Sequence, residues 1–351
     1  MLRREFLVNT TGALGAMSLP GGLSNYFNTT KMGIVVHSYA MRWKSKITSS
    51  QYPSFNDAID LLDHAAAINA GGIQVMVNDW PADYSKKFRD KREKSGLYFE
   101  GSITLPKSVN DLALFESQVI QAKEAGASVL RTVTFGPRRY ETFKSFKSWT
   151  DFKKQALFNL QLAEPILKKH TIKLAVENHK DFRSDEMLTL FKSIESEYIG
   201  SNFDFGNNIA LLEDPIVVLD RLAPYVVSTH IKDMAVTEYD KGFLLSEVPL
   251  GTGILDLKKM IDICKKNNPN VNFNLEMITR DPLEVPVYTK DYWATFMDTP
   301  ATDLSNIMMW AKDNKKQLPK ISSLSDQDKL KVEEENILAC LAYSREKLNM
   351  N

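Results

Sequence analysis

The stretch that decides the fold is residues 172–179, which read IKLAVENH. The first six residues are a short and mostly apolar run that contains the β-branched residues Ile172 and Val176. This composition predicts a buried strand over 172–177. Helical patterns flank this run at 151–169 and 185–194, so helix, strand and helix follow one another. The polar residues Glu177, Asn178 and His179 stand at the carboxyl end of the predicted strand.

The same alternation of strand and helix extends in both directions from this unit. Strands are predicted at 33–37, 72–77, 97–103, 128–135, 172–177, 201–205, 225–231 and 271–276, and helices at 55–70, 85–94, 111–125, 151–169, 185–194, 215–222 and 256–266. This pattern favours an α/β fold of the TIM type, a closed (β/α)8 barrel. A competing open doubly wound sheet is disfavoured, because the sequence has no G-x-G-x-x-G after the first strand and no P-loop.

The lengths divide the chain into a barrel and two flanking parts. Residues 31–300 are predicted to form the barrel, because 31–276 alone hold 246 residues and such a barrel needs about 250. Two further helical stretches, 303–316 and 325–348, form a predicted appendage over 301–351 that packs on the barrel.

Residues 1–30 are predicted to be an export signal and linker. Arg3 and Arg4 precede a short run of apolar and small residues at 11–19, the order found in secretory signals. The paired arginines resemble a twin-arginine signal, which predicts an exported, periplasmic protein, with a Sec-type signal or an ordinary N-terminus as alternatives. Neither this run nor a later one is long enough to span a bilayer, so no membrane insertion is expected after signal removal.

Charge and cysteine content exclude several classes of partner and site. The chain has 351 residues, and its 44 Lys and Arg residues balance 44 Asp and Glu residues. The zero net charge argues against a nucleic-acid partner and against binding to anionic membranes. Two cysteines, Cys264 and Cys340, supply neither a disulfide framework nor a cysteine zinc site. A metal site is therefore sought among carboxylates and histidines.

Four potential metal ligands stand at the carboxyl ends of the last four predicted strands: Glu177, Asp204, His230 and Glu276. Small or polar residues stand two positions before them, on the same face of each strand: Ala175, Asn202, Ser228 and Asn274. This parity places the ligands inside the barrel, where adjacent strands lie about 4.8 Å apart. Three carboxylates and one imidazole suit one divalent ion, with Mn²⁺, Mg²⁺ or Co²⁺ favoured over Zn²⁺. The alternative is that these four are ordinary polar residues at the rim of the barrel. Their matching positions at four successive strand ends argue against it.

Other polar residues are expected near the same end of the barrel. His37 ends the first strand, Arg131 lies within the fourth, and His179 follows the fifth. Lys232 lies beyond His230 with the same parity. Each is a candidate for substrate binding, and each has an ordinary structural or surface role as its alternative.

Several further features have two interpretations. Aromatic residues in two predicted long loops, 233–252 and 278–301, either stack on sugar faces or pack against the C-terminal helices. Arg138 and Arg139 are candidates for binding a phosphate or a carboxylate. The turn at 251–253 forms either an anion nest or a plain glycine turn. His64 and His170 lie in predicted helices and are expected to be structural.

The residues at these strand ends resemble the motifs of a known superfamily. The order Glu, Asp, His, Glu, together with the strings VENH (176–179), FDFGN (203–207), HIKD (230–233) and PLGTGILD (249–256), is similar to xylose-isomerase-like sugar isomerases and epimerases. The resemblance covers about residues 31–290, and the arginine pair resembles the signal of exported members. It implies a metal held by the four ligands, with Glu177 and Glu276 exchanging a proton with carbon. A divalent ion stabilises the enediolate that such proton transfer requires.

One position departs from the pattern of that superfamily. Asn207 stands where many of its ketose epimerases have a histidine, three residues after Asp204, which argues against plain ketose 3-epimerase activity. Asn207 becomes a substrate-binding candidate. We expect a metal-dependent isomerase or epimerase of a neutral sugar or keto-sugar, with a small-molecule sugar or glycoside as its partner. The alternatives are a lyase that eliminates the aglycone from a 3-keto-glycoside and a non-catalytic sugar-binding barrel, and a homo-oligomer is an open option.

Overall fold

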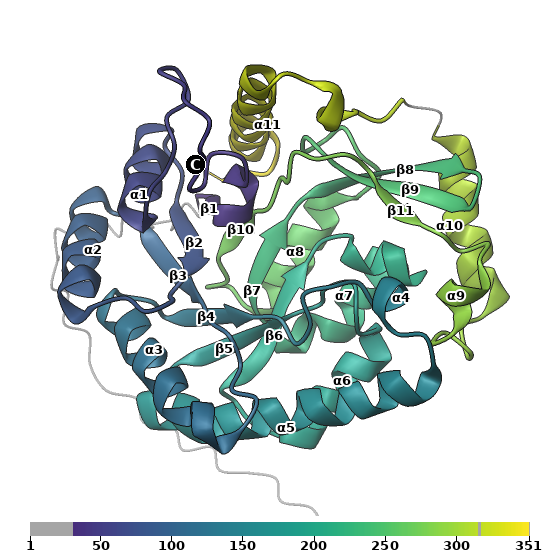
Figure 1. Cartoon of the computed structure of the whole chain (residues 1–351), viewed down its shortest axis with the longest axis horizontal. Coiled ribbons are helices and arrows are strands. Elements are labelled where there is room, and N and C mark those ends of the chain that lie inside the picture. The colour runs from purple at the N-terminus through teal and green to yellow at the C-terminus, as the bar shows by residue number, and fades with distance from the viewer. Residues whose placement is uncertain (1–30, 315–316, 351) are drawn as a thin grey trace, which may run out of the picture.

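The computed structural model describes residues 31–314 and 317–350, so the predicted export segment at 1–30 lies outside the described residues. Within them, eight parallel strands close into a barrel in the spatial order β1-β10-β7-β6-β5-β4-β3-β2 (Figure 1). These strands are β1 (Gly33–Val35), β2 (Gly72–Met76), β3 (Tyr98–Ser102), β4 (Val129–Thr132), β5 (Lys173–Glu177), β6 (Ile199–Asp204), β7 (Val226–Ile231) and β10 (Phe273–Leu275). The predicted TIM barrel is confirmed.

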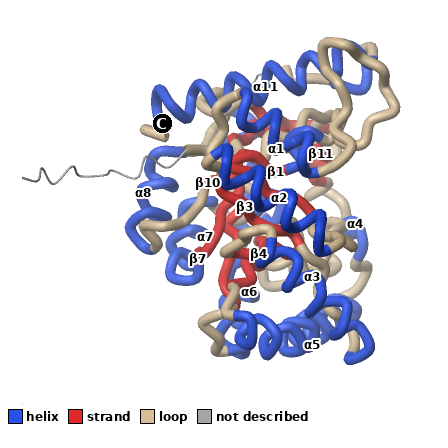
Figure 2. The backbone as a smooth tube through the Cα atoms, turned by 90° about the vertical axis from the view of Figure 1, so that its left-hand side faces the viewer, coloured by secondary structure: helices blue, strands red, loops and turns tan. Residues whose placement is uncertain are grey.

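Helices enclose the barrel on its outer side, as Figure 2 shows. They are α1 (Ala58–Ala67), α2 (Ala82–Ser95), α3 (Leu112–Glu124), α4 (Arg139–Thr142), α5 (Phe146–His170), α6 (Ser184–Ile194), α7 (Pro215–Leu222) and α8 (Leu257–Asn267), followed by α9 (Lys290–Trp293), α10 (Ala301–Asp313) and α11 (Asp326–Lys347). Helix α5 begins five residues before its predicted start, because the Ser145 hydroxyl accepts a hydrogen bond from the Ser148 amide and caps the helix there. No helix in the described part of the chain is both long and apolar enough to cross a membrane.

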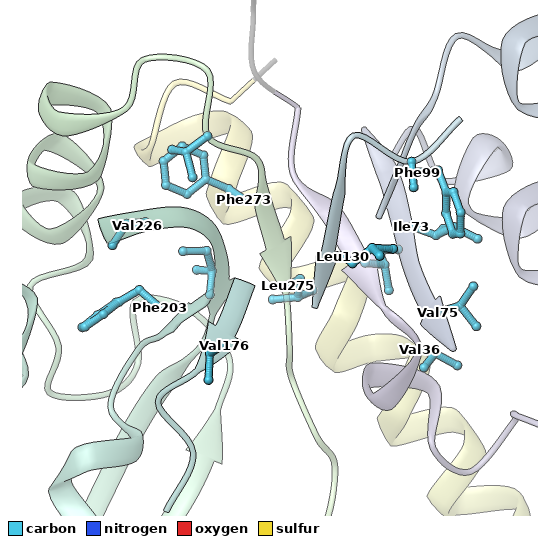
Figure 3. Packing of buried hydrophobic residues seen from close by; sticks show 14 of the residues in the cluster. Val36, Ile73, Val75, Phe99, Leu130, Val176, Phe203, Val226, Phe273 and Leu275 are labelled. Atoms are coloured by element: carbon cyan, nitrogen blue, oxygen red, sulfur yellow. The ribbon is translucent and has the colours of Figure 1, made fainter. Parts of the chain in front are cut away.

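The apolar core lies between the strands and the surrounding helices. Ile73 on β2, Leu130 on β4, Val176 on β5 and Phe203 on β6 point outward and are fully or almost fully buried (Figure 3). Burying a side chain of this size stabilises a fold by about 1.5–3 kcal/mol. Because side chains alternate along a strand, the outward packing of these residues directs their neighbours into the barrel. Glu177 follows Val176 and Asp204 follows Phe203, which fixes the direction of both carboxylates.

The segment after β7 is not the long loop that the sequence predicts. The strands β8 (Asp233–Tyr239) and β9 (Gly242–Val248) form a hairpin, and β11 (Leu283–Val285) pairs with β9. Alternate residues of this sheet, among them Met234, Val236 and Phe243, pack with α10 in a second apolar cluster. Phe243 and Tyr292 are buried there, so these two aromatic side chains pack the C-terminal helices rather than line the mouth of the barrel.

The beginning of the barrel also differs from the prediction. Strand β1 ends at Val35, and residues Val36–Tyr39 form a short 3₁₀ helix that carries His37 over the barrel end. Helix α11 is fixed beside this turn, because the Glu333 carboxylate accepts hydrogen bonds from the amides of Met41 at 2.7 Å and Arg42 at 3.2 Å. The C-terminal helix therefore packs on the barrel through polar contacts as well as apolar ones.

Candidate metal centre

Four ligand atoms converge at the carboxyl end of the barrel. One atom each from Glu177, Asp204, His230 and Glu276 lies within 4.8 Å of the others, and all four residues are buried. Nδ1 of His230 lies 3.4 Å from Glu177 Oε2, 3.8 Å from Asp204 Oδ2 and 3.4 Å from Glu276 Oε1. These spacings fit atoms that share one cation. The structure thus brings together the four residues that the sequence places at strand ends.

A chain of hydrogen bonds orients His230. Its Nε2 lies 2.7 Å from Oε1 of Gln74, and the Gln74 amide nitrogen donates to Glu100 Oε2 at 3.0 Å. Because the Gln74 nitrogen is used in this way, its oxygen accepts the Nε2–H of His230, which assigns the proton to Nε2. This leaves Nδ1 as the ring nitrogen that faces the carboxylates. Metal-binding histidines are commonly oriented by such an outer partner.

Two buried polar atoms in this cluster lack a hydrogen-bond partner among the described residues. They are Nδ1 of His230 and Oδ1 of Asp204. Buried polar atoms are rarely left unpaired, and a metal ion would satisfy both. Burial opposes protonation of His230, but the carboxylates of Glu276 and Glu177 outweigh it and raise its pKa to about 9. A cation is therefore favoured at this position, and the donor set fits a divalent metal.

Two basic side chains hold the glutamates in their ionised form. Arg131 donates from Nε to Glu177 Oε2 at 2.7 Å, and Lys232 donates from Nζ to Glu276 Oε2 at 2.7 Å. Burial would raise the pKa of Glu177, but Arg131 and His230 outweigh burial and lower it to about 2. Burial is likewise outweighed at Glu276, where Lys232 and His230 hold the pKa well below its usual range. Both glutamates are therefore carboxylates at neutral pH.

The other substrate-binding candidates surround the same cavity, which has a volume of about 230 Å³. His37, Arg131, His179, Asn207 and Lys232 all line it. The imidazole of His37 is partly exposed, with Nδ1 3.1 Å from Glu276 Oε1. His179 is neutral, because burial lowers its pKa to about 3. Asn207 donates from Nδ2 to Asp204 Oδ2, so this amide holds the carboxylate of a candidate metal ligand in place.

Arg139 and the turn at 251–253, two candidates for anion binding, have structural roles. Arg139 is buried and donates to Glu186 at 2.7 Å and to both oxygens of Thr295, which leaves it unable to bind an external anion. The turn at 251–253 is filled by this chain's own carboxylate: the amides of Gly251 and Gly253 donate to Asp233 Oδ2 at 3.0 and 2.9 Å. It is therefore not an open anion nest.

The remaining two histidines have structural partners, as expected. His64 contacts Glu334 at 3.1 Å and Tyr39 at 2.9 Å, beside helix α11. His170 contacts Glu116 at 2.7 Å at the end of α5.

Sequence reasoning missed five residues of this region. Gln74 and Glu100 are buried inside the barrel, Lys180 and Arg280 line the cavity, and Glu247 pairs with Arg280. Gln74 and Glu100 are polar residues in the middle of short predicted strands, which is a signal that could have found the first two. Glu247 lies in β9, which the sequence analysis took for loop, and pairs with Arg280.

The chain is similar in sequence or in fold to several known proteins. A 3-oxo-isoapionate decarboxylase of Pectobacterium atrosepticum is 26% identical over 250 residues, which span 69% of this chain and 84% of that protein. A D-psicose 3-epimerase structure with D-tagatose, from Clostridium cellulolyticum H10, has a TM-score of 0.58 at 11% identity, over 90% of this chain and 98% of that one. A xylose isomerase-like TIM barrel protein from Mycobacterium smegmatis in complex with magnesium has a TM-score of 0.53 at 15% identity, over 81% and 98% of the two chains.

At these identities the two solved structures show a shared fold. The family assignment comes from the sequence itself, because residues 54–295 match the family model described as xylose isomerase-like TIM barrel. That match spans most of the chain and includes all four converging ligands. The protein belongs to the xylose isomerase-like TIM barrel family.

Proposed function

We propose that the protein is a divalent-metal-dependent enzyme that moves a proton on carbon next to the carbonyl of a sugar or keto-sugar, as an isomerase or epimerase. The observation that carries this proposal is the convergence of Glu177, Asp204, His230 and Glu276, with two of their buried atoms unpaired. Membership of a sugar-processing fold family and the fold of D-psicose 3-epimerase support it. The same ligands would hold Mn²⁺, Mg²⁺ or Co²⁺, and magnesium accompanies one structural neighbour.

The chain's own residues supply the acid–base chemistry. A divalent ion, when bound, polarises the substrate carbonyl and stabilises negative charge that develops on its oxygen. Glu177 and Glu276 remain ionised beside Arg131 and Lys232, so either can accept the proton from carbon. His37 lies 3.1 Å from Glu276 at the exposed rim, where it is placed to pass a proton to solvent. Protons removed by one glutamate and returned by the other give epimerisation, and return to a neighbouring carbon gives isomerisation.

A lyase is the second candidate, favoured by the presence of Asn207. An amide does not act as an acid or base near neutral pH, so the histidine function of ketose epimerases is missing at this position. In a 3-keto-glycoside, removal of the proton at C2 drives departure of the aglycone from C1. Lys232 lies at the cavity and could donate a hydrogen bond to a leaving oxygen. The relative named as a decarboxylase supports cleavage chemistry, since loss of CO₂ from a 3-oxo acid also forms an enolate.

Isotope exchange, measured on protein of known metal content, distinguishes the isomerase or epimerase from the lyase. The metal-loaded chain is incubated with free ketoses and with 3-keto-glucosides in D₂O. Deuterium on carbon with the aglycone retained supports the isomerase or epimerase, whereas released aglycone supports the lyase. Glu177→Gln should reduce either reaction by about 10²–10⁴-fold. A protein that binds no metal, with no exchange for any sugar, would leave a sugar-binding barrel as the remaining interpretation.

Export to the periplasm and a twin-arginine signal at Arg3 and Arg4 are further parts of this proposal. The paired arginines and the following apolar run support them. Such an enzyme would meet sugars and glycosides outside the cytoplasm.

A further inference from the structure

The wall of the cavity above the metal cluster is rich in cations. Arg131 on β4, Lys180 after β5, Lys232 after β7 and Arg280 after β10 all line it. A buried cation is unfavourable unless groups of opposite charge and hydrogen-bond acceptors surround it. A cation that is paired with a carboxylate of the chain is therefore part of the fold, whereas a cation without such a partner is available to a ligand.

Three of these cations are paired with carboxylates of the chain. The pairs are Arg131–Glu177, Lys232–Asp204, Lys232–Glu276 and Arg280–Glu247. These three cations face four carboxylates, so each has a partner of opposite charge within the wall and helps to hold the cavity together without any ligand.

Lys180 is the exception. It is only 3% exposed, and its Nζ donates to Oδ1 of Asn207, with no carboxylate within 4 Å among residues 31–314 and 317–350. An ammonium has three N–H donors, and that amide is the one acceptor that the described residues offer it. Burial and the nearby charge of Lys232 lower its pKa to about 8, so most Lys180 side chains stay charged at neutral pH.

The position of Lys180 ties it to the metal centre. Asn207, which accepts from Lys180, donates in turn to Asp204 Oδ2. The ammonium is thus two hydrogen bonds from a metal ligand and lines the same cavity as Glu177 and Glu276. A substrate that reaches the metal through one end would bring a neighbouring group within reach of Lys180.

We propose that Lys180 binds a carboxylate of the substrate, so that the enzyme acts on a sugar acid or keto-sugar acid rather than on the uncharged sugar expected from the sequence. The inference rests on the proposed function, since the same molecule must present its carbonyl to the metal centre. The three paired cations and Lys180 together equal the four carboxylates in number, so a divalent ion would add two positive charges that these groups do not offset. An anionic substrate compensates that charge, and a neutral sugar does not.

A carboxylate fits this site better than a phosphate. Phosphate sites commonly combine several cations with backbone amides at a glycine-rich turn. Here the glycine turn at 251–253 is filled by Asp233, and Arg139 is saturated by Glu186 and Thr295. One ammonium with a single amide partner matches a singly charged group.

The test compares two probes that share their hydroxyl chain and differ in charge, D-gluconate and D-glucitol. Binding to the metal-loaded full chain is measured by titration calorimetry. We expect gluconate to bind at least tenfold more tightly than glucitol, and Lys180→Met to reduce that ratio to about twofold. Lys180→Arg should keep most of the preference. Lys173→Met is the matched control, because Lys173 is exposed at the start of the same strand, β5, and should leave the ratio unchanged.

Each variant is checked for metal content and melting temperature, so that a loss of the carboxylate preference is not confused with loss of the fold or of the metal. Equal binding of both probes by the parent protein would overturn the proposal. So would an undiminished preference in Lys180→Met, which would mean that the metal alone holds the carboxylate. Borohydride trapping of 2-keto-D-gluconate on Lys180 would also overturn it, because the amine would then be a nucleophile. These readouts need no turnover, so absence of isotope exchange would count against the proposed function alone.

Discussion

The Nε2 atom of His230 lies 2.7 Å from Oε1 of Gln74, and these residues belong to strands that β10 and β1 separate in the barrel wall. Gln74 is in turn fixed by Glu100, whose strand β3 lies across the barrel from β7. The imidazole at the metal cluster is therefore oriented by side chains from the first half of the chain. This relationship leads to the first of four predictions.

Replacing Gln74 by leucine should weaken metal binding by about 10–100-fold, the range seen when the outer partner of a metal-binding histidine is removed. The loss follows because Nε2 of His230 would be left without an acceptor and the ring would be free to turn or change tautomer. Metal affinity is measured by competition with a chelating dye. Gln161→Leu, at an exposed position of α5, is the control. An unchanged affinity in Gln74→Leu would contradict the role given to this hydrogen bond.

The docking of helix α11 should depend on pH through Glu333. Burial raises the pKa of this carboxyl from 4.5 to about 7, despite hydrogen bonds from the Met41 and Arg42 amides. Its contribution to stability is therefore complete below about pH 4.5 and is lost as the pH rises through about 7. Relative to Glu333→Gln, the parent protein should lose up to about 3 kcal/mol of unfolding free energy between pH 5 and 8.

Urea unfolding at pH 5, 6.5 and 8 measures this difference. Glu335→Gln, at an exposed position of the same helix, should follow the parent protein at all three values. Parallel curves for the parent and Glu333→Gln would show that the carboxyl does not change its protonation over this range.

The turn that closes the β8–β9 hairpin onto the barrel should depend on Asp233. Its carboxylate accepts hydrogen bonds from the amides of Gly251, Gly253 and Leu255. Asp233→Ala removes the acceptor of these three donors and should lower the unfolding free energy by about 2–4 kcal/mol, at roughly 0.5–1.5 kcal/mol for each hydrogen bond lost. Asp233→Asn, which keeps one acceptor oxygen, should lose less.

Chemical denaturation of both variants provides the measurement. Asp298→Ala removes an exposed carboxylate and serves as the control. If Asp233→Ala and Asp298→Ala were equally stable, the carboxylate would not be what holds the turn.

Export should require the arginine pair at the N-terminus. Changing both Arg3 and Arg4 to lysine should leave most of the protein in the cytoplasm of a bacterial host that has the twin-arginine route, since that receptor reads the pair. Cell fractionation followed by immunoblotting measures the distribution. Continued export of the double variant would favour a Sec-type signal, which tolerates lysine in its charged region.

The barrel and the converging ligands could be predicted because both depend on local patterns. Alternating strands and helices specify a TIM barrel, and side-chain parity along β5, β6 and β7 directs Glu177, Asp204 and His230 inward. Gln74 and Glu100 were missed because their role depends on which strands face each other across the interior. Lys180 lies three residues beyond its strand, where the chain turns and parity no longer gives a direction.

The hairpin was missed for a different reason. Residues 233–236 and 242–248 are mostly buried, but the exposed polar residues Glu238, Asp240 and Lys241 separate them, so the segment resembles a loop when its sequence is read alone. Their strand structure depends on pairing between β8 and β9 and on α10, which covers them. Because Glu247 and Arg280 meet only in this assembled layer, their ion pair could not be foreseen either.

The four candidate metal ligands and the side chains that orient His230 come from different strands, so a bound metal ion would report on folding. The four ligands come from β5, β6, β7 and the end of β10, whereas the side chains that orient His230 come from β2 and β3. A partly folded chain that lacked the pairing of β1 with β2 and β10 would present the ligands without the oriented imidazole. Such a chain would hold Co²⁺ more weakly, so at a limiting concentration of Co²⁺ the visible absorption of the bound ion would rise as the last strands close.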